Sequence, residues 1–597
     1  MKYSSTLIFL VISILIGVNV HAQKDEFLTF YEQSGYSKTP DYDQTIDYCK
    51  ELADASPWVS YTNFGKSPQG RELPLLIIDK DGFGQSREVR QTEKIVVLIQ
   101  AGIHAGEING KDAGLMLIRD IAITKKLESL LNNVTILFIP IYNVDGHEHF
   151  GPYSRINQNG PDECGWRTNA SNLNLNRDFL KAEAPETQAW LKLFIEWLPE
   201  FFVDIHSTDG ADYQYALTYG METFGLMSSD LNDWQKNTFL KYVENKMEKA
   251  DYPIYPYVMF RNWHDPRSGL RGGVGNPMLS QAYSAIQNRP GLLIESHMLK
   301  DYKTRVSSTY EMLIHSLTIL NKESYKLKKM IHESEIYVSG NDFRANKFTL
   351  KWQTTSDSQM VDFKGVEYSS EKSDLTGGLW FQYSKEKKNF SIPYFNKFEP
   401  KKQVVLPEAY IIPAEWTEVI KRLEMHGIEI WKTTKESKIN VSTYKFTDLK
   451  WSQKPYEGRQ TLVDFNIKQL EETKVFPAGS VVVSMNQATA KVIAFILEPE
   501  APGSFVYWGF FNPIFEQKEY GESYVMEKVA REMLEKDPAL KAEFELKKKD
   551  NPDFANNQWE ILNWFYSKTP YWDNRINAYP VGRILSPSEL NKLEFTE

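Results

Sequence analysis

The chain has 597 residues and a formal net charge of −10, and 42% of its residues are hydrophobic and 25% are charged. This composition is typical of a soluble globular protein and excludes fibrous and intrinsically disordered classes. The length predicts two or more domains, and the acidic balance argues against nucleic acid as a partner. The two cysteines, Cys49 and Cys164, exclude a framework of disulfides and leave open whether they pair or stay free.

The first 22 residues are predicted to be a signal peptide. Lys2 supplies a positive start, Leu7 to Val20 is nearly all apolar, and Val20-His21-Ala22 offers a small residue at each position that a signal peptidase reads. The apolar run of about 14 residues is shorter than the roughly 20 that span a bilayer. We therefore expect cleavage after Ala22, export to the periplasm or the exterior, and no membrane span once the signal is removed.

Four unbroken apolar runs follow in the first half of the chain, at 95–100, 134–142, 201–205 and 292–294. Such runs are typical of strands that are buried on both faces of a parallel sheet. Patterns typical of helices lie between them, at 110–123, 186–198 and 230–247. The sequence therefore predicts an α/β domain with a mixed, mainly parallel sheet covered by helices.

The pattern changes near residue 330, which predicts a first domain over 23–332 and a C-terminal region over 333–597. Within that region the segments predict a β-rich part over 336–400, a mixed α/β part over 405–500, and a helical and aromatic tail over 520–597. The aromatic side chains of the tail are expected to be core rather than a surface for stacking on sugars. No motif in this region indicates its function.

A His-x-x-Glu pair occurs three times, as His104 with Glu107, His332 with Glu335, and His426 with Glu429. Imidazole and carboxylate groups are zinc ligands, and a catalytic zinc keeps three protein ligands and one open position for water. By itself the spacing is more typical of a solvated helix face. The sequence around each pair must therefore show whether the pair belongs to a metal site.

His104 alone has that context, because it closely follows the predicted strand 95–100. His206 and Glu295 end two further predicted strands. Ligands of α/β sheets bind at the carboxyl ends of the strands, so these groups are expected to converge. His332 and His426 have no such partners and are interpreted as structural or surface residues.

Several further stretches of the chain accompany these residues. In chain order, the stretches are Gly65–Arg71, His104 to Glu107, Asn143–Gly146, Trp166–Thr168, Leu175–Phe179, Ile205–Ser207 and Glu295. With these stretches, the sequence over about residues 40–305 resembles the carboxypeptidase A-like family of zinc metallocarboxypeptidases. The resemblance implies the fold of that family for the first domain and a zinc-dependent peptidase activity.

The resemblance also implies a metal site and a catalytic base. His104, Glu107 and His206 would hold one Zn²⁺ per chain. The zinc would lower the pKa of its bound water toward about 7 and polarise the scissile carbonyl. Glu295 would take the proton of the water and pass it to the leaving amine.

Two arginines and a tyrosine complete the implied site. Arg167 would stabilise the oxyanion, and Arg177 with Asn176 would bind the C-terminal carboxylate of a peptide. For each arginine, surface ion pairing is the alternative. Tyr283 is the nearest candidate for the substrate-capping tyrosine of the family, with a core tyrosine as the alternative.

Two positions depart from the family pattern. Asn174 stands where the family has an acidic partner of a ligand imidazole, and its side-chain oxygen can still orient the ring. Gly106 stands where many relatives have an arginine that contacts substrate. The glycine-rich loop before Glu295 aligns poorly, so the preference for a terminal residue stays open. His264 and His297 are interpreted as bystanders, or at most as residues that support the site from behind.

Three functions therefore remain. The first is an exported metallocarboxypeptidase that removes C-terminal residues from peptides. The second is a cell-wall peptide amidase or endopeptidase that acts on peptidoglycan peptides with the same zinc site. The third is an inactive peptidase-like binding module, which the intact ligands and Glu295 disfavour. The oligomeric state is not predicted.

Overall fold

The computed structural model describes residues 27–595, and the predicted signal peptide lies outside them. These residues form two compact units. Unit 1 comprises 27–406, 419–429 and 484–504, and unit 2 comprises 407–418, 430–483 and 505–595. Cys49 and Cys164 are both buried and free, so they form no disulfide.

Unit 1 is built on an eight-stranded sheet with the order β1-β2-β4-β3-β5-β9-β6-β7. The strands are β1 (Val59–Lys66), β2 (Glu72–Ile78), β3 (Ile95–Ala101), β4 (Val134–Ile139), β5 (Phe201–Thr208), β6 (Leu217–Met221), β7 (Ile254–Pro256) and β9 (Gly291–His297). The middle strands pair in parallel, while β1, β2 and β6 bring antiparallel pairings. The prediction of a mixed, mainly parallel sheet is confirmed.

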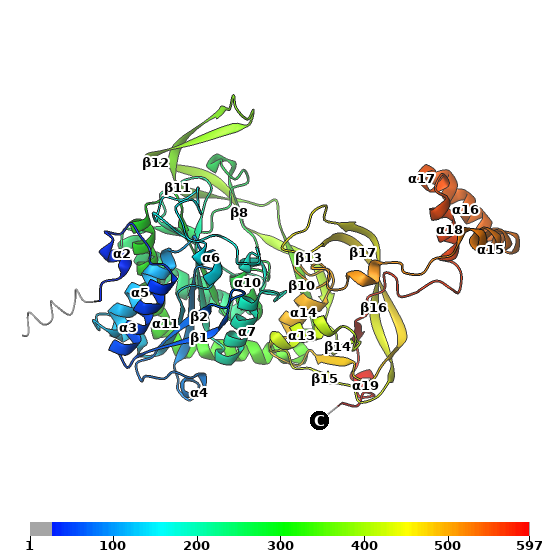
Figure 1. Ribbon diagram of the computed structural model, residues 1–597, viewed down its shortest axis with the longest axis horizontal. Coiled ribbons are helices and arrows are strands. Elements are labelled where there is room, and N and C mark those ends of the chain that lie inside the picture. The colour runs from blue at the N-terminus through cyan, green and yellow to red at the C-terminus, as the bar shows by residue number, and fades with distance from the viewer. Residues whose placement is uncertain (1–26, 596–597) are drawn as a thin grey trace, which may run out of the picture. The chain divides into compact units, whose positions relative to one another are not determined.

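Helices lie on both sides of this sheet (Figure 1). Helix α5 (Asn109–Ala122) packs against α11 (Tyr302–Ser339) and against the middle strands, while α10 (Ser280–Ile286) packs on β5 and β9, and α7 (Pro185–Trp197) packs on β1. Strands β3 and β5 are buried along their whole length. Burial on both faces explains why these strands are continuous apolar runs rather than alternating ones. None of the helices in residues 27–595 combines the length and the apolar character needed to cross a membrane.

Two predicted elements differ in detail. The strand expected over 134–142 ends at Ile139. Pro140 follows, and a proline has no N–H to donate to a neighbouring strand. The helix expected over 230–247 consists of α8 (Ser229–Trp234), a wider π-helical stretch over Gln235–Leu240, and α9 (Lys241–Lys249).

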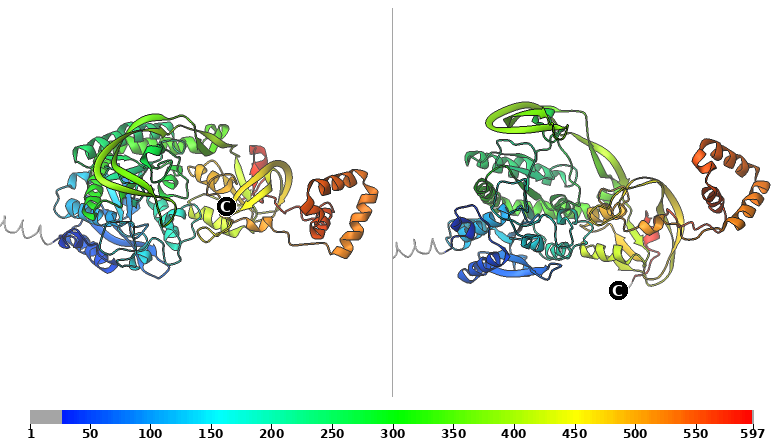
Figure 2. Two further views of the ribbon diagram at one scale, coloured as in Figure 1. Left: turned by 90° about the horizontal axis from the view of Figure 1, so that it is seen from above. Right: turned by 45° about the horizontal axis from the view of Figure 1, so that its top comes forward.

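The predicted domain boundary at residue 332 falls inside α11, which is a single helix of 38 residues. Beyond it lie α12 (Asn341–Ala345), β10 (Lys347–Thr354), β11 (Gln359–Lys372), β12 (Leu379–Phe395) and β13 (Phe398–Val405). Strands β11 and β12 form a long antiparallel hairpin, visible in Figures 1 and 2. The base of β12 pairs with β8 (Leu270–Arg271), so this hairpin is part of unit 1 and holds the segment before the glycine-rich loop.

Unit 2 contains a six-stranded sheet and a group of helices. The sheet has the order β15-β18-β14-β19-β16-β17, and its longest strands, β16 (Ser437–Trp451) and β17 (Leu462–Phe476), form an antiparallel hairpin. The shorter strands are β14 (Ala409–Ile412), β15 (Trp431–Lys432), β18 (Val481–Ser484) and β19 (Gly582–Ile584). The principal helices are α15 (Ser523–Lys536), α16 (Pro538–Asp550) and α18 (Gln558–Tyr566). Several of the tail aromatics are core, as Phe565 and Tyr566 are buried among these helices, whereas Trp559 and Tyr571 are exposed.

His426 is a buried residue of unit 1, as expected for a histidine outside the metal site. Its Nε2–H donates to the carbonyl of Leu180 over 2.9 Å, and its Nδ1 accepts from the hydroxyl of Tyr283 over 2.8 Å. Desolvation lowers the pKa of His426 to about 4. The ring is therefore neutral in the folded protein at neutral pH, whereas in the unfolded chain it titrates near 6.5.

This difference predicts a loss of stability in acid. The contribution of His426 is complete above pH 6.5 and falls as the pH drops toward 4, because only the unfolded chain gains the proton. Between pH 7 and 5 the loss is about 2 kcal/mol in the free energy of unfolding. In urea titrations at both pH values, we expect His426→Gln to be less stable than wild type at pH 7 but less sensitive to the drop in pH. An unchanged pH dependence in the variant would contradict this.

Candidate functional site

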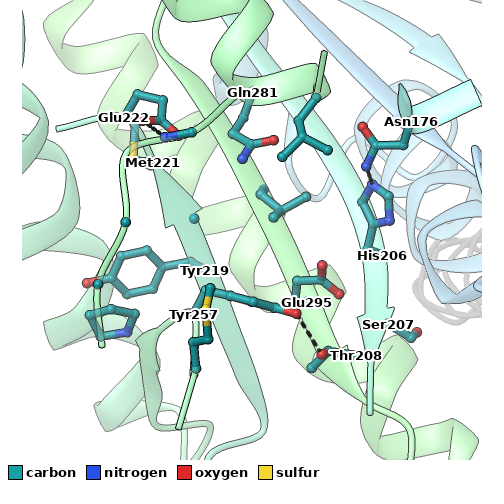
Figure 3. A pocket seen from close by; sticks show the side chains of 18 of the residues that line it. Asn176, His206, Ser207, Thr208, Tyr219, Met221, Glu222, Tyr257, Gln281 and Glu295 are labelled. Carbon is teal, nitrogen blue, oxygen red and sulfur yellow. Dashed lines mark hydrogen bonds between the residues drawn. The ribbon is translucent and has the colours of Figure 1, made fainter. Parts of the chain in front are cut away.

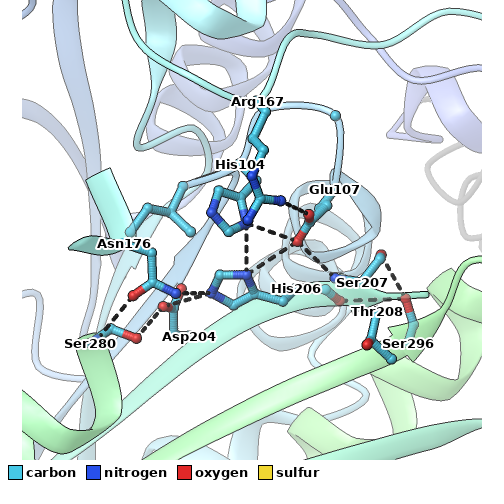
Figure 4. Close-up of polar contacts among 12 residues, drawn as sticks. His104, Glu107, Arg167, Asn176, Asp204, His206, Ser207, Thr208, Ser280 and Ser296 are labelled. Carbon is cyan, nitrogen blue, oxygen red and sulfur yellow. Dashed lines mark hydrogen bonds and ion pairs between the residues drawn. The ribbon is translucent and has the colours of Figure 1, made fainter. Parts of the chain in front are cut away.

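Three side chains converge at the carboxyl edge of the sheet (Figure 4). His104 and Glu107 lie in the short turn between β3 and α5, and His206 lies on the adjacent parallel strand β5. Gly102 makes the turn with a φ of +69°, a conformation that L side chains rarely adopt. All three side chains are buried, with 2–4% of their surfaces exposed.

The distances among these groups fit a zinc ion. The Nδ1 atoms of His104 and His206 are 3.2 Å apart, and Oε2 of Glu107 lies 3.2 Å from the first and 3.1 Å from the second. Ligand atoms about 2.0–2.1 Å from a tetrahedral zinc are roughly 3.3 Å from one another. Two imidazole nitrogens and a carboxylate oxygen are also the donor set that zinc prefers, so the residues present fit this metal.

The far side of each imidazole has an acceptor that fixes the ring. Nε2 of His104 lies 3.0 Å from Oδ1 of Asn174, and Nε2 of His206 lies 2.9 Å from Oδ2 of Asp204. An Nε2–H that donates to these oxygens leaves Nδ1 to face the metal position. Asn174 therefore has the orienting role that its side-chain oxygen suggested.

Asp204 was not predicted from the sequence. It lies two residues before His206 on β5, so both side chains point to the same face of the strand. Its carboxylate also accepts from Gln100 and Ser280. Burial alone would raise the pKa of Asp204, but the contacts with His206, Ser280 and Gln100 outweigh burial and lower it. Asp204 is thus an ionised, hydrogen-bonded partner of His206.

We expect Asp204→Asn to weaken zinc binding by roughly 10- to 100-fold, because the amide removes the negative charge behind His206. Competition with a fluorescent zinc chelator measures this affinity. Asp209→Asn is the matched control, since Asp209 is exposed nearby in the chain and has no contact with His206. Equal zinc affinity in wild type and Asp204→Asn would contradict the assignment.

Arginines surround the second oxygen of Glu107. Oε1 accepts from Nη2 of Arg155 over 3.0 Å and from Nη1 of Arg167 over 3.2 Å. The side chain of Arg167 is 42% exposed, whereas that of Arg155 is only 10% exposed. Arg155 lies in a loop, where no helix or strand pattern of the sequence predicts the position of its side chain. A Cβ at Gly106 would lie 2.4 Å from Cγ of Arg155, so the glycine that departs from the family pattern makes room for this second arginine.

A cavity of about 1430 Å³ opens over this group. It is lined by the three converging residues and by the other predicted site residues Glu295, Arg167, Asn176 and Arg177. Glu295 lies opposite His206 in the register of β9 with β5 and points into the cavity, as Figure 3 shows. Its Oε2 is buried and has no hydrogen-bond partner among residues 27–595. Burial raises the pKa of Glu295 to about 8.

Asn176 and Arg177 lie in a short 3₁₀ turn, Leu175–Arg177, at the wall of the cavity. Oδ1 of Asn176 accepts from the backbone N–H of Ser280 over 3.0 Å, and Nη1 of Arg177 donates to the carbonyl of Asn176 over 2.6 Å. These contacts hold an amide and a guanidinium at the wall of the cavity.

Tyr283 does not line the cavity. It lies on α10, is fully buried, and donates its hydroxyl proton to His426. Its neighbours Ala282, Ala285 and Ile286 are also buried, which explains why this turn of helix faces the core. The structure thus places Tyr283 apart from the other predicted site residues. Tyr257 lines the cavity instead, with its hydroxyl 3.2 Å from that of Thr208.

The comparisons with known proteins indicate a zinc-dependent family. The sequence model of the zinc carboxypeptidase family matches residues 45–419. The chain belongs to the zinc carboxypeptidase family. Carboxypeptidase 2 of Trichophyton rubrum is 24% identical over 503 residues, which cover 80% of this chain and 87% of that protein. Carboxypeptidase 2 of Trichophyton equinum is 24% identical over 491 residues, covering 79% and 84%. A crystal structure of the carboxypeptidase A from Helicoverpa armigera covers 49% of this chain and 75% of its own, with 20% identity and a TM-score of 0.37.

The prediction of a zinc metallocarboxypeptidase with an α/β fold is therefore confirmed at the level of the family. Within this zinc carboxypeptidase, the family metal fits the group of His104, Glu107 and His206.

Proposed function

We propose that this zinc carboxypeptidase is an exported enzyme that hydrolyses the last peptide bond of peptides and releases the C-terminal amino acid. One observation carries the proposal. A single cavity holds the His104–Glu107–His206 group, a carboxylate at Glu295 with an unpartnered oxygen, and the guanidinium of Arg177. These are a metal site, a proton acceptor and a carboxylate-binding group within reach of one substrate.

His104, Glu107 and His206 would hold one zinc ion per chain. When bound, zinc supplies a Lewis acid that activates water and polarises a carbonyl. Asp204 and Asn174 keep both imidazoles in the tautomer that presents Nδ1 to the metal.

Glu295 acts as the general base and then as the general acid. It takes a proton from the attacking water as the new C–O bond forms, and gives a proton to the nitrogen as the C–N bond breaks. The products are the shortened peptide and a free amino acid. Burial raises the pKa of Glu295, and the positive charge of a nearby metal ion would lower it again, which keeps the carboxylate available as a base.

Arg167 and Arg177 act on the substrate in different ways. Arg167 points toward the ligand Glu107 from the cavity wall, so its guanidinium can donate to the carbonyl oxygen as negative charge develops there. Arg177 and Asn176 bind the free C-terminal carboxylate, for which a planar guanidinium is well matched. A carboxylate held there limits cleavage to the last bond.

A digest of defined peptides followed by mass spectrometry tests the proposal. We expect the wild type to remove residues one at a time from free C-termini, and to leave C-terminally amidated peptides largely intact. Internal cleavage, or action on peptidoglycan fragments without action on ordinary peptides, would instead support the cell-wall amidase or endopeptidase. Export rests on the N-terminal segment, and N-terminal sequencing of the mature protein checks cleavage after Ala22.

A further inference from the structure

A buried carboxylate that belongs neither to the metal group nor to the proposed base lines the same cavity. Glu222 directly follows β6 and is 8% exposed (Figure 3). One oxygen, Oε2, accepts from the backbone N–H of Gly275 over 2.9 Å, and the side chain of Gln281 gives a further hydrogen bond. Glu222 is therefore held by neutral donors only.

No cation neutralises Glu222 within the described part of the chain. Among the described residues, Glu107 has Arg155 and Asp178 has Lys181, whereas the buried Glu186 and Asp112 form no ion pair. Unlike Glu222, neither Glu186 nor Asp112 lines the cavity. Lys236, Arg271 and Lys397 also line the cavity, but all three are exposed and none forms an ion pair with Glu222. Burial raises the pKa of Glu222 to about 7. A buried acid without a cation costs stability, which is typical of a group kept for a ligand.

The backbone around Glu222 is shaped to admit its carboxylate. A Cβ at Gly275 would lie only 2.1 Å from Oε1 of Glu222. Any side chain at position 275 would displace the carboxylate, so the glycine-rich loop leaves this end of the cavity to Glu222. Oε1 of Gln281 is also buried there, and no described residue gives it a hydrogen bond. The end of the cavity thus offers a carboxylate and an amide oxygen and still needs a hydrogen-bond donor.

The position of Glu222 suits a long side chain. Thr218 of β6 lies opposite Glu295 in the antiparallel register with β9, and Glu222 is four residues farther along. At about 3.4 Å per residue, this places Glu222 roughly 14 Å along the strand direction from the position opposite Glu295. Leu279, Leu293 and Met221 line the cavity as well. Apolar walls that lead to an acid match a side chain with an aliphatic stem and a cationic head.

We infer that the enzyme prefers peptides that end in lysine or arginine, with Glu222 binding the cationic head group and Gln281 accepting a further hydrogen bond from it. This inference rests on the proposed function, since it concerns the residue that the enzyme releases. It assigns the specificity of the cavity to Glu222, a residue that no motif in the sequence pointed to.

Matched substrates test the preference in the wild type. We expect kcat/KM for a peptide that ends in arginine to exceed that for the citrulline analogue by at least about tenfold, because citrulline has the same shape without the charge. Likewise, kcat/KM for a peptide that ends in lysine should exceed that for a peptide that ends in norleucine. Equal rates within each pair, or a preference for the neutral analogue, would overturn the inference. Release of neutral residues would still support a carboxypeptidase, whereas no C-terminal release from any peptide would overturn the proposed function itself.

The variant Glu222→Gln removes the charge and keeps the shape. In this variant we expect the ratio of kcat/KM for the arginine peptide to kcat/KM for the citrulline peptide to fall toward one. Glu244→Gln is the matched control, because Glu244 lines the same cavity but is exposed and already accepts from the hydroxyl of Tyr219. Its ratio should stay near that of the wild type. An unchanged ratio in Glu222→Gln, or equal effects of both variants, would contradict the role of Glu222. If Glu222→Gln does not fold, the wild-type pairs decide the question alone.

Discussion

Glu295→Gln is expected to lower kcat by roughly 10²- to 10⁴-fold, the usual contribution of a general base. The amide has nearly the shape of the carboxylate but cannot take the proton of the attacking water. Steady-state kinetics on a peptide with a free C-terminus measure the loss. Zinc content should stay at the wild-type level, because Glu295 lies beside the group of His104, Glu107 and His206 and is not part of it.

Glu244→Gln again serves as the control, since it removes an exposed carboxylate from the wall of the same cavity. A Glu295→Gln enzyme with wild-type kcat would show that another group takes the proton. A loss of both zinc and activity would show instead that Glu295 supports the metal.

Arg177→Ala is expected to lower kcat/KM for peptides with a free C-terminus. The loss corresponds to about 2–5 kcal/mol of transition-state stabilisation, which is the cost of losing one partner of a buried charge pair. The amidated form of the same peptide has no carboxylate for Arg177 to bind, so the already low rate on that peptide should change little. The pair of substrates separates a lost contact from a general disturbance of the site.

Equal losses on the free and the amidated peptide would contradict the carboxylate-binding role of Arg177. Such a result would favour a structural role, since Nη1 of Arg177 also donates to the backbone carbonyl of Asn176. Arg177→Lys extends the test. It keeps the charge but loses the planar fork, so it should recover only part of the loss.

The sequence predicted the parts of the site that regular elements position. His104 and His206 follow from buried apolar strands that end at one edge of the sheet, and Glu295 follows from the adjacent strand. Asp204 could also have been predicted, because residues two apart on a strand point to the same face. The spacing His-x-x-Glu alone did not distinguish these residues from the exposed His332 or the buried His426.

Apart from Asp204 on β5, the residues that were missed lie outside regular elements. Arg155 reaches Glu107 from a long loop, and Glu222 depends on Gly275 more than fifty positions away in the chain. No periodicity places such side chains, because their positions depend on how the loops pack. Tyr283 has the core position that was the alternative for it, because helix α10 turns the tyrosine toward the core and His426.

The segment after residue 333 also contributes to the site. Tyr394, Asn396, Lys397 and Phe398, at and after the end of β12, line the cavity. The pairing of β12 with β8 places them near the glycine-rich loop. The sequence of this segment predicted only a β-rich region. A pairing between strands that are far apart in the chain cannot be recognised from the sequence of either strand.

The most direct test is a zinc titration of the metal-free enzyme, with activity on a free-carboxylate peptide followed against the zinc bound per chain. We expect no activity after chelation, and a linear recovery that saturates at one zinc per chain. Activity that persists in the metal-free enzyme, or one bound zinc without recovery of C-terminal hydrolysis, would contradict a zinc carboxypeptidase site at His104, Glu107 and His206.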